Sequence, residues 1–145
     1  MSFSSRAMTP ADWQGITHFT PSEFKAPDKM GYEFMVWLDG VREQAGVSMK
    51  ITSSYRSPAY NASVGGAKDS AHTDVPCDAV DIGKDPSPSD PNWNYARFKI
   101  VDTALKAGCV RVGFYPNGSL HLDRTEDQRP APRLWNAVDN KATTP

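Results

Sequence analysis

Two histidines and one aspartate are the residues of this sequence best suited to metal chemistry. His72 lies in the stretch SAHTDVPCDAVDI (70–82), and Asp81 follows it nine residues later. His121 lies in SLHLD (119–123). Two imidazoles and one carboxylate, with a fourth position left to water, form a common open zinc site for hydrolysis. Because bound zinc lowers the pKa of water to about 7, such a site supplies a nucleophile at neutral pH.

The same residues have simpler explanations. A histidine in a polar loop, such as His72, is commonly solvated, and one on a half-buried strand can be packed with its N–H satisfied. Cys77 and Asp78, which lie between the first two candidates, are alternative ligands. Manganese, cobalt or nickel also suits histidine and carboxylate ligands. Composition alone therefore leaves the zinc site as one hypothesis among several.

Strands are the elements expected to position these side chains. Alternating or apolar stretches bounded by turn residues predict strands over 47–55, 80–82, 109–115 and 119–123. The last two are separated by PNG, which is typical of a turn between hairpin strands. Because residues i and i+2 of a strand point to the same face, we expect His121 and Asp123 to lie side by side.

Helical periodicity accounts for much of the rest of the chain. In HFTPSEF (18–24), a helix start is predicted, with Thr20 as cap and Glu23 at the third position. The helix predicted from about Lys29 to Ala45 carries an apolar stripe of Phe34, Leu38, Val41 and Ala45, with Gly46 as terminator. A second helix, from Asn92 to Ala107, is expected to bury Phe98, Val101 and Leu105. The order of elements predicts an α+β domain with a small antiparallel sheet and helices packed on one side.

Length and composition limit the possible classes of protein. The 145 residues, of which 39% are apolar and 23% charged, suit one globular domain over 1–145. Within it, 137–145 is predicted to be a flexible tail and 84–92 a surface loop. The net charge is −1 and no run of Lys or Arg exceeds two residues, so nothing predicts nucleic-acid binding.

We expect neither a signal peptide nor a membrane-spanning segment in this sequence. No apolar run reaches about 18 residues, which argues against membrane insertion, and the N-terminal stretch has no apolar signal-peptide core. We expect a monomer made in the cytoplasm, acting on its target after release or as part of a virion. Cys77 and Cys109 are too few for a disulfide framework, so we expect reduced thiols.

Several segments, in this order, resemble a known family of enzymes. ITSSYRSPAYNASVGGAKDSAH, then AVDI, then VGFYPNGSLHLD resemble the M15 peptidases, which are zinc D-Ala-D-Ala carboxypeptidases and phage cell-wall endopeptidases with the hedgehog/DD-peptidase fold. FTPSEF also resembles the first helix of that family, so the likeness covers about residues 18 to 124. No single motif is specific, but their combination is.

The resemblance implies a role for each motif residue. It implies zinc ligands at His72, Asp81 and His121, and a substrate-binding, catalytic arginine at Arg56. The planar guanidinium group suits this task because it pairs with carboxylate oxygens, although Arg56 could also be a surface residue. Ser70 falls on the serine two residues before the first ligand, which implies substrate binding or shaping of the loop, unless it is merely a turn residue.

The sequence departs from the family pattern in two places. The spacing of nine between His72 and Asp81 is longer than usual, and Cys77 stands where glycine is common; a longer loop costs little free energy. Many relatives also place an acid three residues before the last histidine, where this chain has Gly118. Asp123 is then either the general base or the residue that orients His121.

Two functions of different classes follow. The first is a zinc peptidase that cleaves peptide bonds in bacterial peptidoglycan, as a phage-type endolysin or virion component, with a D-Ala-D-Ala carboxypeptidase as the nearest alternative. The second is a binding or structural module that keeps the zinc fold without catalysis. A metal-free α+β domain is a third hypothesis, which predicts that a chelator leaves stability unchanged.

Overall fold

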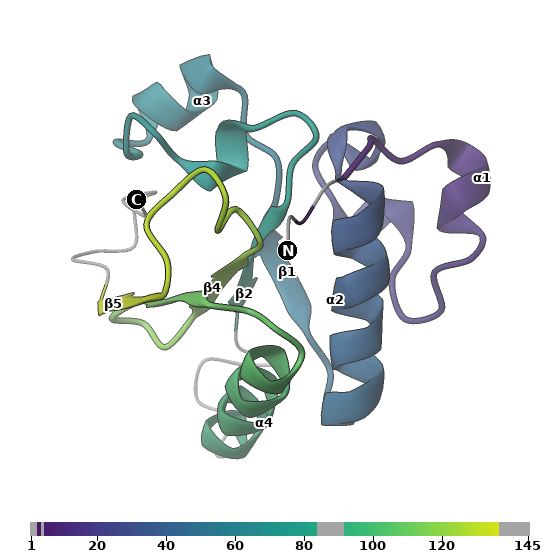
Figure 1. Cartoon of the computed structure of the whole chain (residues 1–145), viewed down its shortest axis with the longest axis vertical. Coiled ribbons are helices and arrows are strands. Elements are labelled where there is room, and N and C mark those ends of the chain that lie inside the picture. Colours follow the sequence, from purple (N-terminus) through teal and green to yellow (C-terminus); the bar gives the residue numbers. More distant parts are fainter. Residues whose placement is uncertain (1–2, 4, 84–91, 137–145) are drawn as a thin grey trace.

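The structure is a computed structural model that describes residues 3, 5–83 and 92–136. Its helices are α1 (Pro10–Trp13), α2 (Tyr32–Ala45), α3 (Pro58–Ser63) and α4 (Trp93–Lys106), with 3-10 helices η1 (Pro21–Glu23), η2 (Pro27–Lys29) and η3 (Ala71–Thr73). Its strands are β1 (Lys50–Ser53), β2 (Ala79–Gly83), β3 (Arg111–Phe114), β4 (Leu120–Asp123) and β5 (Arg133–Asn136). The predicted α+β class is confirmed (Figure 1). In the described part of the chain, no helix is long and apolar enough to cross a membrane.

The strands form one sheet in the order β1-β2-β4-β3-β5. The first four pair antiparallel, and β3 and β4 form the predicted hairpin. The strand β5 was not predicted, and it pairs parallel with β3, so the sheet is mixed. The four residues of β5 follow a proline-rich stretch and are too short for a clear alternation, so pairing with β3 is what makes them a strand.

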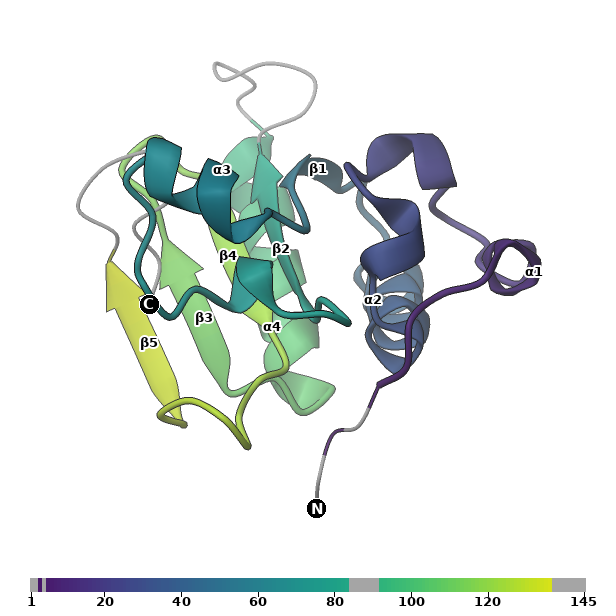
Figure 2. The same cartoon turned by 90° about the horizontal axis from the view of Figure 1, so that it is seen from above.

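The two faces of the sheet are buried in different ways. Val80 and Ile82 of β2 and Leu120 and Leu122 of β4 point to one face and are fully buried in the apolar core. The two long helices, α2 and α4, pack against each other on this side. The short elements α3 and η3 lie on the opposite side of the sheet, where the predicted ligands are (Figure 2).

Helix α2 confirms its predicted stripe and terminator. Phe34, Leu38, Val41 and Ala45 are all buried. Gly46 follows the helix with φ of 69°, a left-handed conformation that glycine adopts without steric cost. The predicted helix start at residues 18–24 is only the single turn η1, in which the Glu23 carboxylate accepts the Thr20 N–H at 2.7 Å.

Helix α4 is rotated relative to the prediction. Its buried residues are Trp93, Ile100 and Ala104, whereas Phe98 is 66% and Leu105 44% exposed and Val101 is only half-buried. The predicted burial was wrong for Phe98 and Leu105, because the helix carries two apolar stripes, whereas Val101 is half-buried and packs against the core. The indole N–H of Trp93 donates to the Gly118 carbonyl at 3.0 Å, and this contact with the hairpin turn helps to select the buried stripe. The predicted loop at 84–92 and the tail at 137–145 lie outside the described residues, apart from Asn92.

Candidate metal centre

Antiparallel pairing of β2 with β4 brings two of the candidate ligands together. Asp81 lies directly opposite His121 in this ladder, and both side chains point to the face that α2 and α4 leave free. Ser53 of β1, Gly113 of β3 and Trp135 of β5 complete the row across the sheet. Strand register therefore joins residues that are 40 positions apart in the chain.

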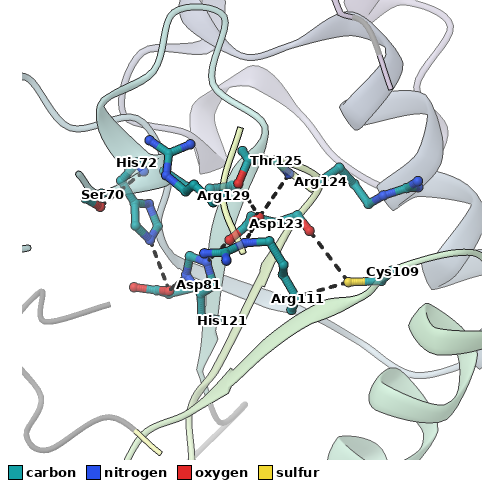
Figure 3. Close-up of polar contacts among 12 residues, drawn as sticks. Ser70, His72, Asp81, Cys109, Arg111, His121, Asp123, Arg124, Thr125 and Arg129 are labelled. Atoms are coloured by element: carbon teal, nitrogen blue, oxygen red, sulfur yellow. Dashed lines mark hydrogen bonds and ion pairs between the residues drawn. The ribbon is translucent and has the colours of Figure 1, made fainter. Parts of the chain in front are cut away.

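The remaining ligand, His72, comes from η3 rather than from the sheet. The Ser70 hydroxyl caps this turn by accepting the His72 backbone N–H at 3.2 Å, and the Arg56 backbone N–H donates to the His72 carbonyl at 2.8 Å. Both histidines are fully buried and Asp81 is 6% exposed. Figure 3 shows the His72 ring directed towards Asp81 from the opposite side to the strand of His121.

Three potential ligand atoms converge at this point. One atom each from His72, Asp81 and His121 lies within 4.8 Å of the others, and this is the metal-binding cluster found among the described residues. Oδ1 of Asp81 is 3.2 Å from Nε2 of His72 and 3.0 Å from Nδ1 of His121. Neither Cys77 nor Asp78 belongs to the cluster, so the geometry does not favour them as ligands.

The outer nitrogen of each imidazole has a partner that fixes the ring. Nδ1 of His72 lies 2.6 Å from the Ser54 carbonyl, and Nε2 of His121 lies 2.7 Å from Oδ2 of Asp123. Because a carbonyl and a carboxylate only accept hydrogen bonds, each of these nitrogens carries the proton. When both imidazoles are neutral, the inner nitrogens present lone pairs towards a carboxylate oxygen. Three such acceptors suit a cation between them, and two nitrogens with one oxygen fit zinc.

The two imidazoles differ in charge when no metal is bound. Burial lowers the pKa of His72, which keeps it neutral and able to bind a metal. Burial also opposes charge on His121, but its hydrogen bonds to Asp123 and Asp81 outweigh it and raise the pKa to about 9, so a metal ion must displace the Nδ1 proton that faces Asp81. Burial opposes the charge on Asp81 as well, yet the two imidazoles outweigh it and lower the pKa of that carboxyl.

Asp123 is a fully buried carboxylate with every oxygen in use. Its Oδ2 accepts from His121, while its Oδ1 accepts from Arg111 Nε at 2.8 Å and from both the N–H and the hydroxyl of Thr125. These interactions outweigh burial and lower its pKa. A carboxylate so stabilised in its charged form is a weak proton acceptor, so the geometry favours orientation of His121 over the general-base hypothesis.

Two donors contact Asp81. Arg56, which is buried, donates to Asp81 Oδ2 at 3.1 Å and also to Asn61 and Ser53. These contacts occupy one hydrogen on each of three nitrogens, and a guanidinium group has five N–H donors. The Tyr115 hydroxyl lies 3.3 Å from both oxygens of Asp81. A cation and a phenol thus hold this candidate metal ligand.

The other predicted residues lie where simpler roles explain them. Ser70 is fully buried under the turn that it caps, which supports the loop-shaping interpretation. Cys77 and Cys109 are buried free thiols, and burial raises the pKa of Cys109 to about 12. The longer loop between His72 and Asp81 is tied down at Cys77, whose backbone bonds to Lys29 and Gly31.

Several residues that support the site were not predicted from the sequence, among them Ser54, Asn61, Arg111, Tyr115 and Thr125. Strand alternation could have revealed two of them. Arg111 and Tyr115 are two residues either side of Gly113 and therefore share the face of His121. Ser54, Asn61 and Thr125 carry no such signal, because their contacts depend on how loops fold back on the sheet.

Comparison with known proteins gives one match. The protein-family model described as Peptidase M15 matches residues 11–123, a segment that contains all three residues of the metal cluster. No match was found among curated proteins or among solved structures.

Proposed function

Since the chain belongs to the peptidase M15 family, we propose that it hydrolyses peptide bonds of bacterial peptidoglycan with a zinc ion held by His72, Asp81 and His121. The observation that carries this proposal is the convergence of three acceptor atoms within 4.8 Å, each fixed by a partner of its own. We further propose that the enzyme acts as a phage-type endolysin or virion component.

The residues around the cluster have complementary tasks. When bound, zinc supplies a Lewis acid and makes a water nucleophilic near neutral pH. Arg56 has N–H groups beyond its three contacts and provides a donor for the oxygen of the scissile carbonyl, while Tyr115 donates its hydroxyl hydrogen to Asp81. Asp123 keeps the proton of His121 on Nε2, so that Nδ1 stays available to the metal.

One observation favours a second, non-catalytic function. At Gly118, where many relatives carry an acid, the chain makes a turn with φ of 93°, and this position has no side chain to accept a proton. Asp123 already accepts hydrogen bonds from His121, Arg111 and Thr125. A module that binds zinc and cell wall without hydrolysis would need no proton acceptor, so this alternative is retained for the test.

Turbidity loss of purified peptidoglycan sacculi tests the proposal. The wild type is compared with His121→Ala and with His18→Ala, in which a half-exposed histidine paired with Glu43 is lost. We expect the wild type and His18→Ala to bind one metal ion per chain and to clear the suspension of sacculi. His121→Ala should lose both the metal and the clearing activity. Mass spectrometry of the fragments identifies the bond, and distinguishes an endopeptidase from a D-Ala-D-Ala carboxypeptidase. Metal binding without any peptide release would instead support the non-catalytic module.

A further inference from the structure

A groove of about 540 Å³ lies beside the metal centre, between segment 22–26 and the chain from β1 to Tyr60. Two of its lining residues also hold metal ligands. The Ser54 carbonyl accepts Nδ1 of His72, and Arg56 donates to Asp81. The groove is therefore continuous with the site, and its volume falls in the range of small-ligand pockets.

The groove contains charged side chains of both signs. Its lining contains two cations, Lys25 and Arg56, and one acid, Glu23. The Glu23 carboxylate accepts the backbone N–H of Thr20 at 2.7 Å and also the Thr20 hydroxyl. Since Arg56 is paired with Asp81, Lys25 is the lining cation that remains for a ligand.

Lys25 is held at the groove by its backbone and by an aromatic ring. Its N–H donates to the Ser54 hydroxyl at 3.1 Å, which ties segment 22–26 to the end of β1. Its ammonium lies 5.5 Å from the centroid of the Tyr60 ring, which is a cation–π contact. Tyr60 is 49% exposed. Among the described residues, Lys25 has no acidic partner within ion-pair distance.

We propose that this groove binds a stretch of the substrate peptide that carries a carboxylate, and that Lys25 pairs with that carboxylate. The inference rests on the proposed function, and it adds a selectivity: an acidic wall peptide is preferred to the same peptide with that acid amidated. Arg56 contacts Asp81 and the scissile bond, whereas Lys25 binds the carboxylate farther along the peptide.

The test uses two synthetic wall peptides that are identical except that one side-group carboxylate is a carboxamide in the second. Wild type, Lys25→Met, Lys25→Arg and Lys50→Met are assayed with both peptides, all loaded with zinc. Lys50 is an exposed lysine at the start of β1 that does not line the groove, which makes it a matched control. Steady-state kinetics give KM and kcat separately, and calorimetry gives the affinity of each protein for each peptide.

We expect the wild type to have a KM about fivefold lower for the carboxylate peptide, with similar kcat, as for one partly exposed ion pair. Lys25→Met should lose this preference, while Lys25→Arg and Lys50→Met should keep it. Equal KM values in the wild type, or an unchanged preference in Lys25→Met, would overturn the inference. If the wild type cleaves neither peptide, the proposed function fails, and calorimetry alone tests whether the groove binds the carboxylate. A wild-type preference in affinity that is lost in Lys25→Met then supports the inference, and equal affinities of the wild type for the two peptides overturn it.

Discussion

The two faces of the β2–β4 ladder are equally buried and chemically opposite. One face carries Val80, Ile82, Leu120 and Leu122, which need only close packing against the helices. The other face carries Asp81, His121 and Asp123, which are 6%, 0% and 0% exposed. Each polar group there has a specific partner, because an unpaired buried charge is costly.

Burial restricts the choice of residues differently on the two faces. On the apolar face, a residue of the right size is sufficient, and one side chain can substitute for another at modest cost. On the polar face, Asp123 alone accepts hydrogen bonds from His121, Arg111 and Thr125. Removing one member of such a network leaves the others unsatisfied. Substitutions on each face of the sheet test this difference.

The largest effect on stability is expected for Asp123→Asn. The change removes the charge that faces Arg111, which is fully buried, so the free energy of unfolding should fall by about 3–5 kcal/mol. Zinc affinity should fall about 10-fold to 100-fold, because His121 loses its orienting carboxylate. Urea unfolding and chelator competition measure the two effects. Asp102→Asn, which removes only an exposed pair with Lys106, is the control and should change neither.

On the apolar face, Leu122→Ala should lower the free energy of unfolding by about 2–4 kcal/mol through lost packing and a cavity. The folded variant should still bind one zinc ion, because Leu122 points away from the ligands. Calorimetric unfolding and metal analysis test this pair of outcomes, and Leu134→Ala, at a 64% exposed position, serves as control. Loss of zinc in folded Leu122→Ala would contradict the separation of the two faces.

Asp78 sharpens the comparison because it is a half-buried carboxylate whose Oδ1 has no hydrogen-bond partner among the described residues. Burial raises its pKa to about 7, whereas the pKa values of Asp81 and Asp123 are lowered by their partners. The folded state therefore favours protonated Asp78. Its contribution to stability is complete below about pH 4 and is lost as the pH rises through 7.

Asp78→Asn should remove this pH dependence. The variant should match the wild type near pH 4 and exceed its free energy of unfolding at pH 8, by an amount on the order of 1–3 kcal/mol. Urea unfolding at a series of pH values measures the difference. A difference that is constant from pH 4 to pH 8 would show that Asp78 titrates normally in the folded protein.

The smallest effect is expected on α4. Phe98→Ala should change the free energy of unfolding by less than about 0.5 kcal/mol, since Phe98 is 66% exposed. Ile100→Ala, two residues along the helix and fully buried, should cost about 2–4 kcal/mol. A larger cost for Phe98→Ala than for Ile100→Ala would mean that the helix is rotated in solution as the sequence pattern predicted.

The sequence by itself determined much of this protein, because the signals involved are local. Alternation fixed β2 and the β3–β4 hairpin and placed His121 and Asp123 on one face, and the stripe of α2 with Gly46 fixed that helix. The α+β class follows from the order of these elements. The motif resemblance proposed the three ligands that the structure brings within 4.8 Å.

Tertiary structure decided between alternatives that local sequence signals do not distinguish. Two apolar stripes on α4 satisfy the same helical period, and only packing selected Trp93, Ile100 and Ala104. The strand β5 exists because β3 offers it a partner. The role of Asp123 likewise depended on Arg111 and Thr125, which come from another strand and a loop. A residue's type fixes which bonds it can make, but its neighbours in space fix which of those bonds remain free for chemistry.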